Sequence, residues 1–357
     1  MRLIRPMLVP RLVSTLLGVV LALPMSVSVA DAAQRKPGAS RRATTVSAKK
    51  KVTYSATASR ARRTSLARAR ASARAREQAR LRGLRQLQEA MTPQYKTDAA
   101  GQVVPDVRAA AAIVFNPVTG QIIYEENSQD KRSIASITKV MTALVYLEDT
   151  PDLNAPVGIE RSDVYAASTT YLKANDQISA GELLHLLLIA SDNAAARALA
   201  RTSHGGTASF IERMNEKAIE LGLQNTSFAD PSGLNPNNVS SAFDLSHLIT
   251  FAASDERIAS IMRMPTYTVT TNRRMIPIHS TNRLVMNGDV EVMGGKTGFI
   301  SKSGYCLATL LRLPQGNPIA VVVLGARSNN GRFWETRHLF SWLNTKAAEL
   351  FKEQTPK

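Results

Sequence analysis

Ser136 and Lys139 stand three residues apart at the start of an apolar stretch, and together they could perform nucleophilic catalysis. Residues three apart on a helix share a face, so the lysine amine can lie beside the serine hydroxyl and take its proton. Burial disfavours the charged ammonium and lowers the pKa of a lysine, which makes the amine a general base near neutral pH. The pair therefore predicts a serine nucleophile that carries its own base.

The same S-x-x-K spacing occurs twice more, from Ser47 to Lys50 and from Ser128 to Lys131, so the surroundings must decide. Ser47 lies in a charged segment, and Ser128 lies in a polar run that is typical of a turn. Only Ser136 precedes apolar residues at helical spacing, which predicts a helix buried on one side with the serine near its amino end. Backbone N–H groups there would face a developing oxyanion.

Two further motifs could complete such a site. Ser191-Asp192-Asn193 follows a predicted helix, and Lys296-Thr297-Gly298 comes about 100 residues later. Taken singly, each tripeptide is close to chance, because a helix cap or a turn between strands would explain it. The order and spacing of the three motifs, each at the end of a predicted element, favour one shared site.

The three motifs together resemble the S-x-x-K, S-D-N and K-T-G set of the penicillin-recognising serine enzymes. Their flanking residues and the segment Asp230-Pro231-Ser232-Gly233-Leu234 are similar to low-molecular-weight penicillin-binding proteins, the D-alanyl-D-alanine peptidases that trim peptidoglycan. The resemblance covers residues 105–351. It implies a mixed α/β fold of the β-lactamase/transpeptidase-like type, an antiparallel sheet flanked by helices with an all-helical subdomain. We expect residues 230–234 to be a structural turn that shapes the groove.

The resemblance also implies catalytic roles. Ser136 would be the nucleophile and Lys139 its base, and Ser191 would relay a proton to the leaving amine. Acyl transfer needs these parts in any enzyme: an activated nucleophile, an acid for the leaving group and donors for the oxyanion. Lys139 and Lys296 in one pocket would each disfavour the protonation of the other, which helps to keep a neutral amine available.

Substrate-binding roles follow from the same resemblance. Asn193 would hydrogen-bond the peptide amide of the substrate, Lys296 would supply positive potential near Ser191, and Thr297 would bind a substrate carboxylate. The backbone N–H groups of Ser136 and Phe299 would form the oxyanion hole. The expected substrate-binding residues are Asn193, Lys296, Thr297, Gly298 and Phe299.

The predicted activity is that of a serine D,D-peptidase that acts on peptidoglycan and is acylated by β-lactams. The chain stops about 60 residues after Lys296, without the further β-domain and anchor that carboxypeptidases often carry. That favours an endopeptidase that cleaves cross-links, with a D-alanyl-D-alanine carboxypeptidase as the alternative. A class A β-lactamase would add E-x-x-L-N between Asn193 and Lys296, and this pattern does not occur there. The alternative that is not an enzyme is a non-catalytic module that binds polyanions.

Charge is concentrated in one part of the chain. The whole chain has a net charge of +17. Residues 34–88 hold seventeen Lys and Arg side chains and one acid, Glu77, so this stretch accounts for nearly all of it. With few large apolar side chains it cannot offset its ordering entropy, and we expect residues 34–104 to be a disordered or transiently helical tail. Its expected partners are anionic membrane or envelope polymers; the export signal argues against nucleic acid.

Residues 1–33 are similar to a secretory signal. They contain three early arginines, an apolar run over residues 16–23 and a small-residue cleavage site at Ala30-Asp31-Ala32. The run is shorter than the about 20 apolar residues of a membrane span. We therefore predict an exported, periplasmic protein that is peripherally associated with the membrane or cell wall.

The elements that must position the motifs can be outlined from the sequence. Strands are predicted near 110–115 and 121–125, helices over most of 136–263, strands at 266–271, 304–313 and 318–325, and a last helix over 332–351. Strands at both ends around a helical middle predict one sheet completed by distant segments. The domain would span 105–351, followed by a tail over 352–357. Cys306 is expected to be a core residue. The five histidines show no metal-binding spacing, and no metal or cofactor is predicted.

Overall fold

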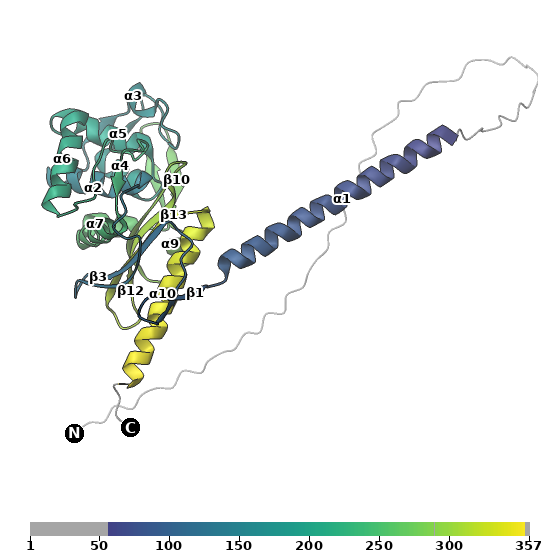
Figure 1. The fold of residues 1–357 in the computed structure, drawn as a ribbon. Coiled ribbons are helices and arrows are strands. Elements are labelled where there is room, and N and C mark those ends of the chain that lie inside the picture. Colours follow the sequence, from purple (N-terminus) through teal and green to yellow (C-terminus); the bar gives the residue numbers. More distant parts are fainter. Residues whose placement is uncertain (1–55, 289, 354–357) are drawn as a thin grey trace, which may run out of the picture. The chain divides into compact units, whose positions relative to one another are not determined.

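The computed structural model describes residues 56–288 and 290–353 of the 357-residue chain (Figure 1). The predicted export signal, the first part of the basic segment and the last four residues lie outside the described residues. The chain divides into two compact units, one ending at Arg68 and the other beginning at Ala69. Among the described residues, no helix is both long enough and apolar enough to cross a membrane.

Helix α1 (Ala56–Met91) lies within the segment that we expected to be disordered or transiently helical. Alanine and arginine both have high helix propensity, which accounts for a long helix without an apolar face. All of its side chains that the structure describes are exposed. Strands β1 (Tyr95–Thr97) and β2 (Val103–Pro105) then pair, so ordered structure precedes the predicted domain start at residue 105.

The central sheet joins the two ends of the domain, as predicted. It is antiparallel with the order β11-β12-β13-β3-β4. Because β13 pairs with β3, the last strand of the chain lies beside the first strand of the sheet. The five strands are β3 (Ala111–Asn116), β4 (Gln121–Glu126), β11 (Val292–Ile300), β12 (Gly304–Arg312) and β13 (Pro318–Ala326).

Both faces of this sheet are buried, each by a different set of helices (Figure 1). Successive strand residues point to opposite faces, so Ile113 packs with helix α7 (Ala242–Ser254) whereas Val114 packs with helix α10 (Asn329–Glu353). Fully burying one such side chain contributes about 1.5–3 kcal/mol. Cys306 is buried in the α7-side core, as predicted.

The helical part lies between β4 and β11 in the sequence. Its helices are η1 (Ala135–Ile137, a 3₁₀ turn), α2 (Thr138–Glu148), α3 (Arg161–Val164), α4 (Ala180–Leu188), α5 (Asn193–Thr202), α6 (Gly206–Glu220), α7, α8 (Glu256–Met262) and α9 (Arg283–Asn287). Three short antiparallel pairs accompany them: β5 (Arg132–Ser133) with β8 (Val239–Ser240), β6 (Pro156–Gly158) with β7 (Gln177–Ser179), and β9 (Thr266–Thr270) with β10 (Met275–His279).

Strand β11 differs from the sequence prediction. Lys296 was expected at the end of an element, but it lies in the middle of this nine-residue strand. The three glycines around it lower strand propensity, which is why the residues alone do not predict the strand. Its pairing with β12 over most of its length overrides that weak local preference.

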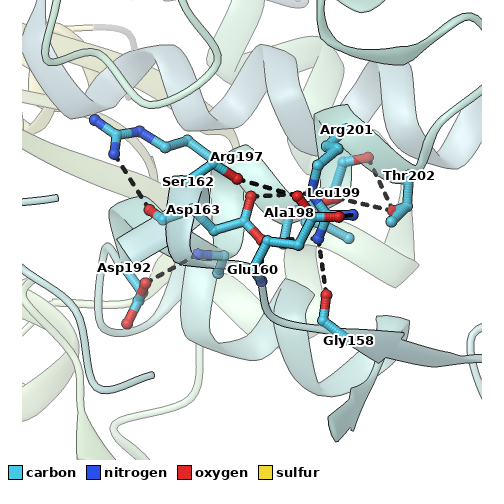
Figure 2. A network of polar contacts seen from close by, with 11 residues as sticks. Gly158, Glu160, Ser162, Asp163, Asp192, Arg197, Ala198, Leu199, Arg201 and Thr202 are labelled. Carbon is cyan, nitrogen blue, oxygen red and sulfur yellow. Dashed lines mark hydrogen bonds and ion pairs between the residues drawn. The ribbon is translucent and has the colours of Figure 1, made fainter. Parts of the chain in front are cut away.

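A polar network holds helix α5 in place (Figure 2). Arg201 donates to the carboxylate of Asp163 at 3.1 and 2.7 Å and to the carbonyl of Gly158 at 2.8 Å, and it lies 3.0 Å from the Glu160 carboxylate. At the other end of α5, the carboxylate of Asp192 accepts from the N–H of Ala195 and caps the helix. Both ends of α5 are therefore fixed.

Replacing the buried acid of this network should destabilise the domain. Asp163 is 2% exposed, so Asp163→Asn leaves Arg201 without its buried counter-charge. We expect the free energy of unfolding to fall by about 2 kcal/mol, measured by urea denaturation. The matched variant Glu160→Gln removes the same charge from a side chain that is 58% exposed, and it should cost about 0.5 kcal/mol or less. Equal effects of the two variants would contradict this explanation.

Candidate active site

Ser136 and Lys139 are joined by a short contact. Ser136 lies in η1, immediately before α2, and Lys139 lies in the first turn of α2. The Lys139 Nζ atom is 2.9 Å from the Ser136 Oγ atom. Ala135 has a φ of 47°, so the backbone enters this turn through the left-handed region. This entry turns the chain sharply just before the serine.

Lys139 is completely buried and is surrounded by neutral acceptors. Its Nζ atom donates to Asn193 Oδ1 at 2.6 Å and to the carbonyl oxygen of Ser232 at 2.5 Å. Burial lowers the pKa of Lys139 to about 7, against the opposing charges of Asp192 and Asp230. A neutral amine has two N–H bonds and one lone pair. With both N–H bonds directed at these acceptors, the lone pair is left for the Ser136 hydroxyl.

Ser191 and Lys296 form the second contact of the site. Ser191 follows α4 with a φ of 61°, and its Oγ atom accepts from Lys296 Nζ at 2.8 Å. Lys296 also donates to the Thr297 carbonyl at 3.1 Å. Burial lowers the pKa of Lys296 well below its ordinary value, and the charges of Lys139 and Arg332 lower it further. We predicted that each lysine would lower the pKa of the other, and the structure shows this effect of Lys139 on Lys296.

Asn193 connects these groups through both ends of its amide. Its Oδ1 atom accepts from Lys139, and its Nδ2 atom donates to the Ala167 carbonyl at 2.7 Å. The side chain is therefore held in one orientation, and it positions the lysine in addition to lining the cleft. This contact adds to the substrate-binding role that the resemblance implies for Asn193.

Strand β11 approaches η1 closely at Gly298. A Cβ atom at this position would lie 2.5 Å from the Ile134 carbonyl and 3.2 Å from the backbone nitrogen of Ser136, so only glycine fits. Thr297 donates its hydroxyl to Thr281 Oγ1 at 2.6 Å. The Phe299 ring is 48% exposed and stacks on Tyr305 with 4.2 Å between ring centroids.

These groups line one open cleft with a volume of about 430 Å³. Ser136, Ser191, Asn193, Thr297, Gly298 and Phe299 all line it, whereas the two lysines lie buried behind the serines. The structure thus brings together every residue that the sequence predicted for the site. Among the residues that the structure describes, no cluster of His, Cys, Asp or Glu could hold a metal ion.

The segment 230–234 shapes the groove, as expected of a structural turn, but it also contributes to the site. Its Ser232 carbonyl accepts from Lys139, a role the sequence analysis missed. The Asp230 carboxylate holds the turn by accepting from the backbone N–H of Ser232, Gly233 and Asn235. Aspartate before Pro-Ser-Gly signalled a turn, but nothing in the sequence indicated the contact with Lys139.

Arg332, in the first turn of α10, is a second residue that the sequence analysis missed. It lines the cleft although it is 5% exposed. Its guanidinium donates to the carbonyls of Gly298 at 3.0 Å and Cys306 at 3.2 Å. Burial lowers the pKa of Arg332 to about 10, so the group stays cationic at neutral pH. It belongs to no motif, and only the packing of α10 on the sheet brings it here.

Comparisons with known proteins agree with this geometry. The profile of the D-alanyl-D-alanine carboxypeptidase family matches residues 96–328. The D-alanyl-D-alanine endopeptidase of Escherichia coli is 32% identical over 245 residues, 68% of this chain and 79% of that protein. The D-alanyl-D-alanine carboxypeptidase DacC of the same species is 34% identical over 262 residues, 68% of this chain and 64% of that protein.

A solved structure has the same fold. The Streptomyces K15 DD-transpeptidase superposes with a TM-score of 0.63 at 28% identity, covering 67% of this chain and 97% of that one. The family match begins at residue 96, within β1, and includes β2. Fold, motifs and sequence similarity lead to one conclusion: the chain belongs to the D-alanyl-D-alanine carboxypeptidase family of penicillin-recognising serine peptidases.

Proposed function

We propose that this protein is a serine D,D-endopeptidase that hydrolyses peptidoglycan cross-links through an acyl-enzyme on Ser136. The observation that carries the proposal is the contact between Ser136 and a buried lysine whose pKa is about 7. Without such a base, a serine hydroxyl is a weak nucleophile at neutral pH. Similarity to the E. coli endopeptidase supports the choice of substrate.

In the proposed acylation, the Ser136 oxygen attacks the D-alanyl carbonyl carbon and its proton passes to Lys139. The backbone N–H groups of Ser136 and Phe299 would stabilise the oxyanion. The tetrahedral intermediate then collapses, the C–N bond breaks, and Ser191 gives its proton to the leaving amine. In the second half of the reaction, water attacks the ester carbonyl and gives a proton to Lys296 through Ser191. Lys139 returns its proton to the Ser136 oxygen as the C–O bond breaks, which restores the serine hydroxyl and releases the D-alanyl carboxylate.

The two lysines divide their tasks in this scheme. Loss of the proton from Lys139 removes one of the charges that lower the pKa of Lys296. When Lys139 is neutral, Lys296 is therefore easier to protonate. Protonated Lys296 would resupply Ser191, which lies 2.8 Å away.

A carboxylate next to the scissile bond would bind beside Thr297 and Arg332, the hydroxyl and the cation at that end of the cleft. A carboxypeptidase would use the same groups for a terminal D-alanine, so it is the second candidate, and the DacC similarity favours it. The larger share of the endopeptidase that the alignment covers, 79% against 64%, favours the first.

The decisive experiment is digestion of purified cross-linked muropeptide dimers and of monomeric pentapeptides. We expect dimers to be converted to monomers faster than D-alanine is released, and Ser136→Ala to abolish both reactions by at least about 10³-fold. The matched control is Ser128→Ala, since Ser128 also stands three residues before a lysine. Release of D-alanine with dimers unchanged would establish the carboxypeptidase instead.

The same variants separate a peptidase from a β-lactamase. Fluorescent penicillin should label the unaltered protein and Ser128→Ala in a stable form, and it should not label Ser136→Ala. Rapid turnover of penicillin would contradict the peptidase assignment. Dimer cleavage that persists in Ser136→Ala would contradict the nucleophile.

Acylation should depend on pH through Lys139. The base is active when neutral, and its lowered pKa places that form above about pH 7. We expect the second-order rate of penicillin acylation to rise roughly tenfold per pH unit below 7 and to level off above it. Stopped-flow fluorescence from about pH 5 to about pH 9 measures this profile. A rate that keeps rising to about pH 10 would show an unperturbed lysine.

We further propose that the protein is exported and that α1 attaches it to anionic envelope polymers. The exposed arginines of this helix and the predicted signal support this. Salt at about 0.5 M should release the full chain from isolated cell envelopes, because it screens charge pairs beyond a few ångströms. Replacing Arg68, Arg70, Arg74 and Arg76 with Gln should weaken retention, whereas replacing them with Lys should preserve it. Salt-resistant retention, or equal loss in both variants, would contradict electrostatic attachment.

A further inference from the structure

A second cavity adjoins the catalytic cleft and serves no step of the proposed mechanism. Its volume is about 590 Å³, and it lies between α9 and the first turns of α10. The two spaces share walls. Ser280 lines the second cavity, whereas its neighbour Thr281 lines the cleft. In the same way, Asn330 and Phe333 line the second cavity, whereas Arg332, between them in the sequence, lines the cleft.

The second cavity is cationic. Arg283 and Arg337 both line it, and no Asp or Glu is among its lining residues in the described part of the chain. Arg283 donates to the neutral amide of Asn330, and its guanidinium lies 6.0 Å from the centre of the Phe333 ring. Among the described residues, no carboxylate pairs with Arg283. Its charge is therefore available to an anionic ligand.

The lining also offers flat apolar surface. The half-buried Trp334 contributes an aromatic side chain and Met286, which is 43% exposed, an apolar one, whereas Phe333 is buried. Guanidinium groups bind carboxylates through paired N–H donors, and aromatic faces pack against a peptide backbone or aliphatic chain. The combination suits a peptide that carries a carboxylate better than a bare inorganic ion.

The position of this cavity identifies the part of the substrate that would reach it. In the proposed function, the carboxylate beside the scissile bond binds at Thr297 and Arg332. Thr297 is bonded to Thr281, which forms the wall between the two spaces. Substrate that continues past this point on the leaving side would enter the second cavity. A terminal D-alanine ends before it, whereas the leaving stem peptide of a cross-link continues and carries further carboxylates.

We propose that the cavity lined by Arg283 and Arg337 binds a second carboxylate of the leaving stem peptide and so directs the enzyme toward cross-linked substrate. This inference rests on the proposed function, because only an endopeptidase has such a leaving group. It assigns to Arg283 a part in substrate choice that acylation of Ser136 does not require.

The experiment compares Arg283→Gln and Arg337→Gln in the full chain on two substrates, muropeptide dimers and monomeric pentapeptides. We expect kcat/KM for dimers, relative to that for D-alanine release, to fall about tenfold in either variant, mainly through KM. Arg161→Gln, which removes an exposed arginine at the start of α3, should leave the ratio unchanged. Penicillin labelling of each variant reports whether the catalytic cleft is folded.

A change in the substrate provides the second arm, which does not depend on how the variants fold. Dimers in which only the leaving-stem carboxylate remote from the scissile bond is converted to an amide, with the carboxylate beside the scissile bond left free, should be cleaved about tenfold less well than free-acid dimers by the unaltered protein. Arg283→Gln should cleave the two kinds of dimer equally well. Equal cleavage of acid and amide dimers by the unaltered protein would overturn the proposal. Failure of the unaltered protein to cleave any dimer, with penicillin labelling intact, would instead refute the proposed endopeptidase.

Discussion

Lys139 is an ionisable side chain placed where water does not reach it, and the rest of the site is arranged around that burial. A buried ammonium without a paired charge is costly, so the amine is accommodated most easily as a neutral group. Two fixed oxygen acceptors, from Asn193 and Ser232, satisfy its N–H bonds and determine where its lone pair points. Removing either acceptor would change the orientation of the base, even with Ser136 left untouched.

This requirement explains why the active site is built from both parts of the domain. Asn193 is the first residue of α5, a helix that the Asp192 cap fixes at its amino end and the Arg201 network at its carboxyl end. Ser136 lies against β11 of the sheet, where Gly298 allows an approach that no other residue could permit. The cleft is therefore the junction between helical part and sheet, and its geometry depends on how precisely these elements are packed.

Much of this arrangement could be predicted from residues alone. Apolar spacing after Ser136 indicated α2, and apolar runs indicated β3, β12 and β13, because local pattern and final burial agree there. Strand β11 could not be predicted, since its glycines disfavour a strand locally and are tolerated only through pairing and close packing. The roles of Ser232 and Arg332 were also inaccessible, because a backbone carbonyl and an unpatterned helix residue acquire them only through tertiary contact.

The placement of negative charge near Lys139 is the last constraint. A carboxylate in direct contact would hold the amine protonated, and the base would be lost. Asp192 and Asp230 raise the pKa of Lys139, yet each carboxylate is occupied by backbone N–H groups, Asp192 at the start of α5 and Asp230 in the 230–234 turn. Each thereby fixes the segment that supplies a neutral acceptor to the lysine. The acids organise the site through the backbone, and the lysine remains close enough to neutrality to accept the proton of Ser136.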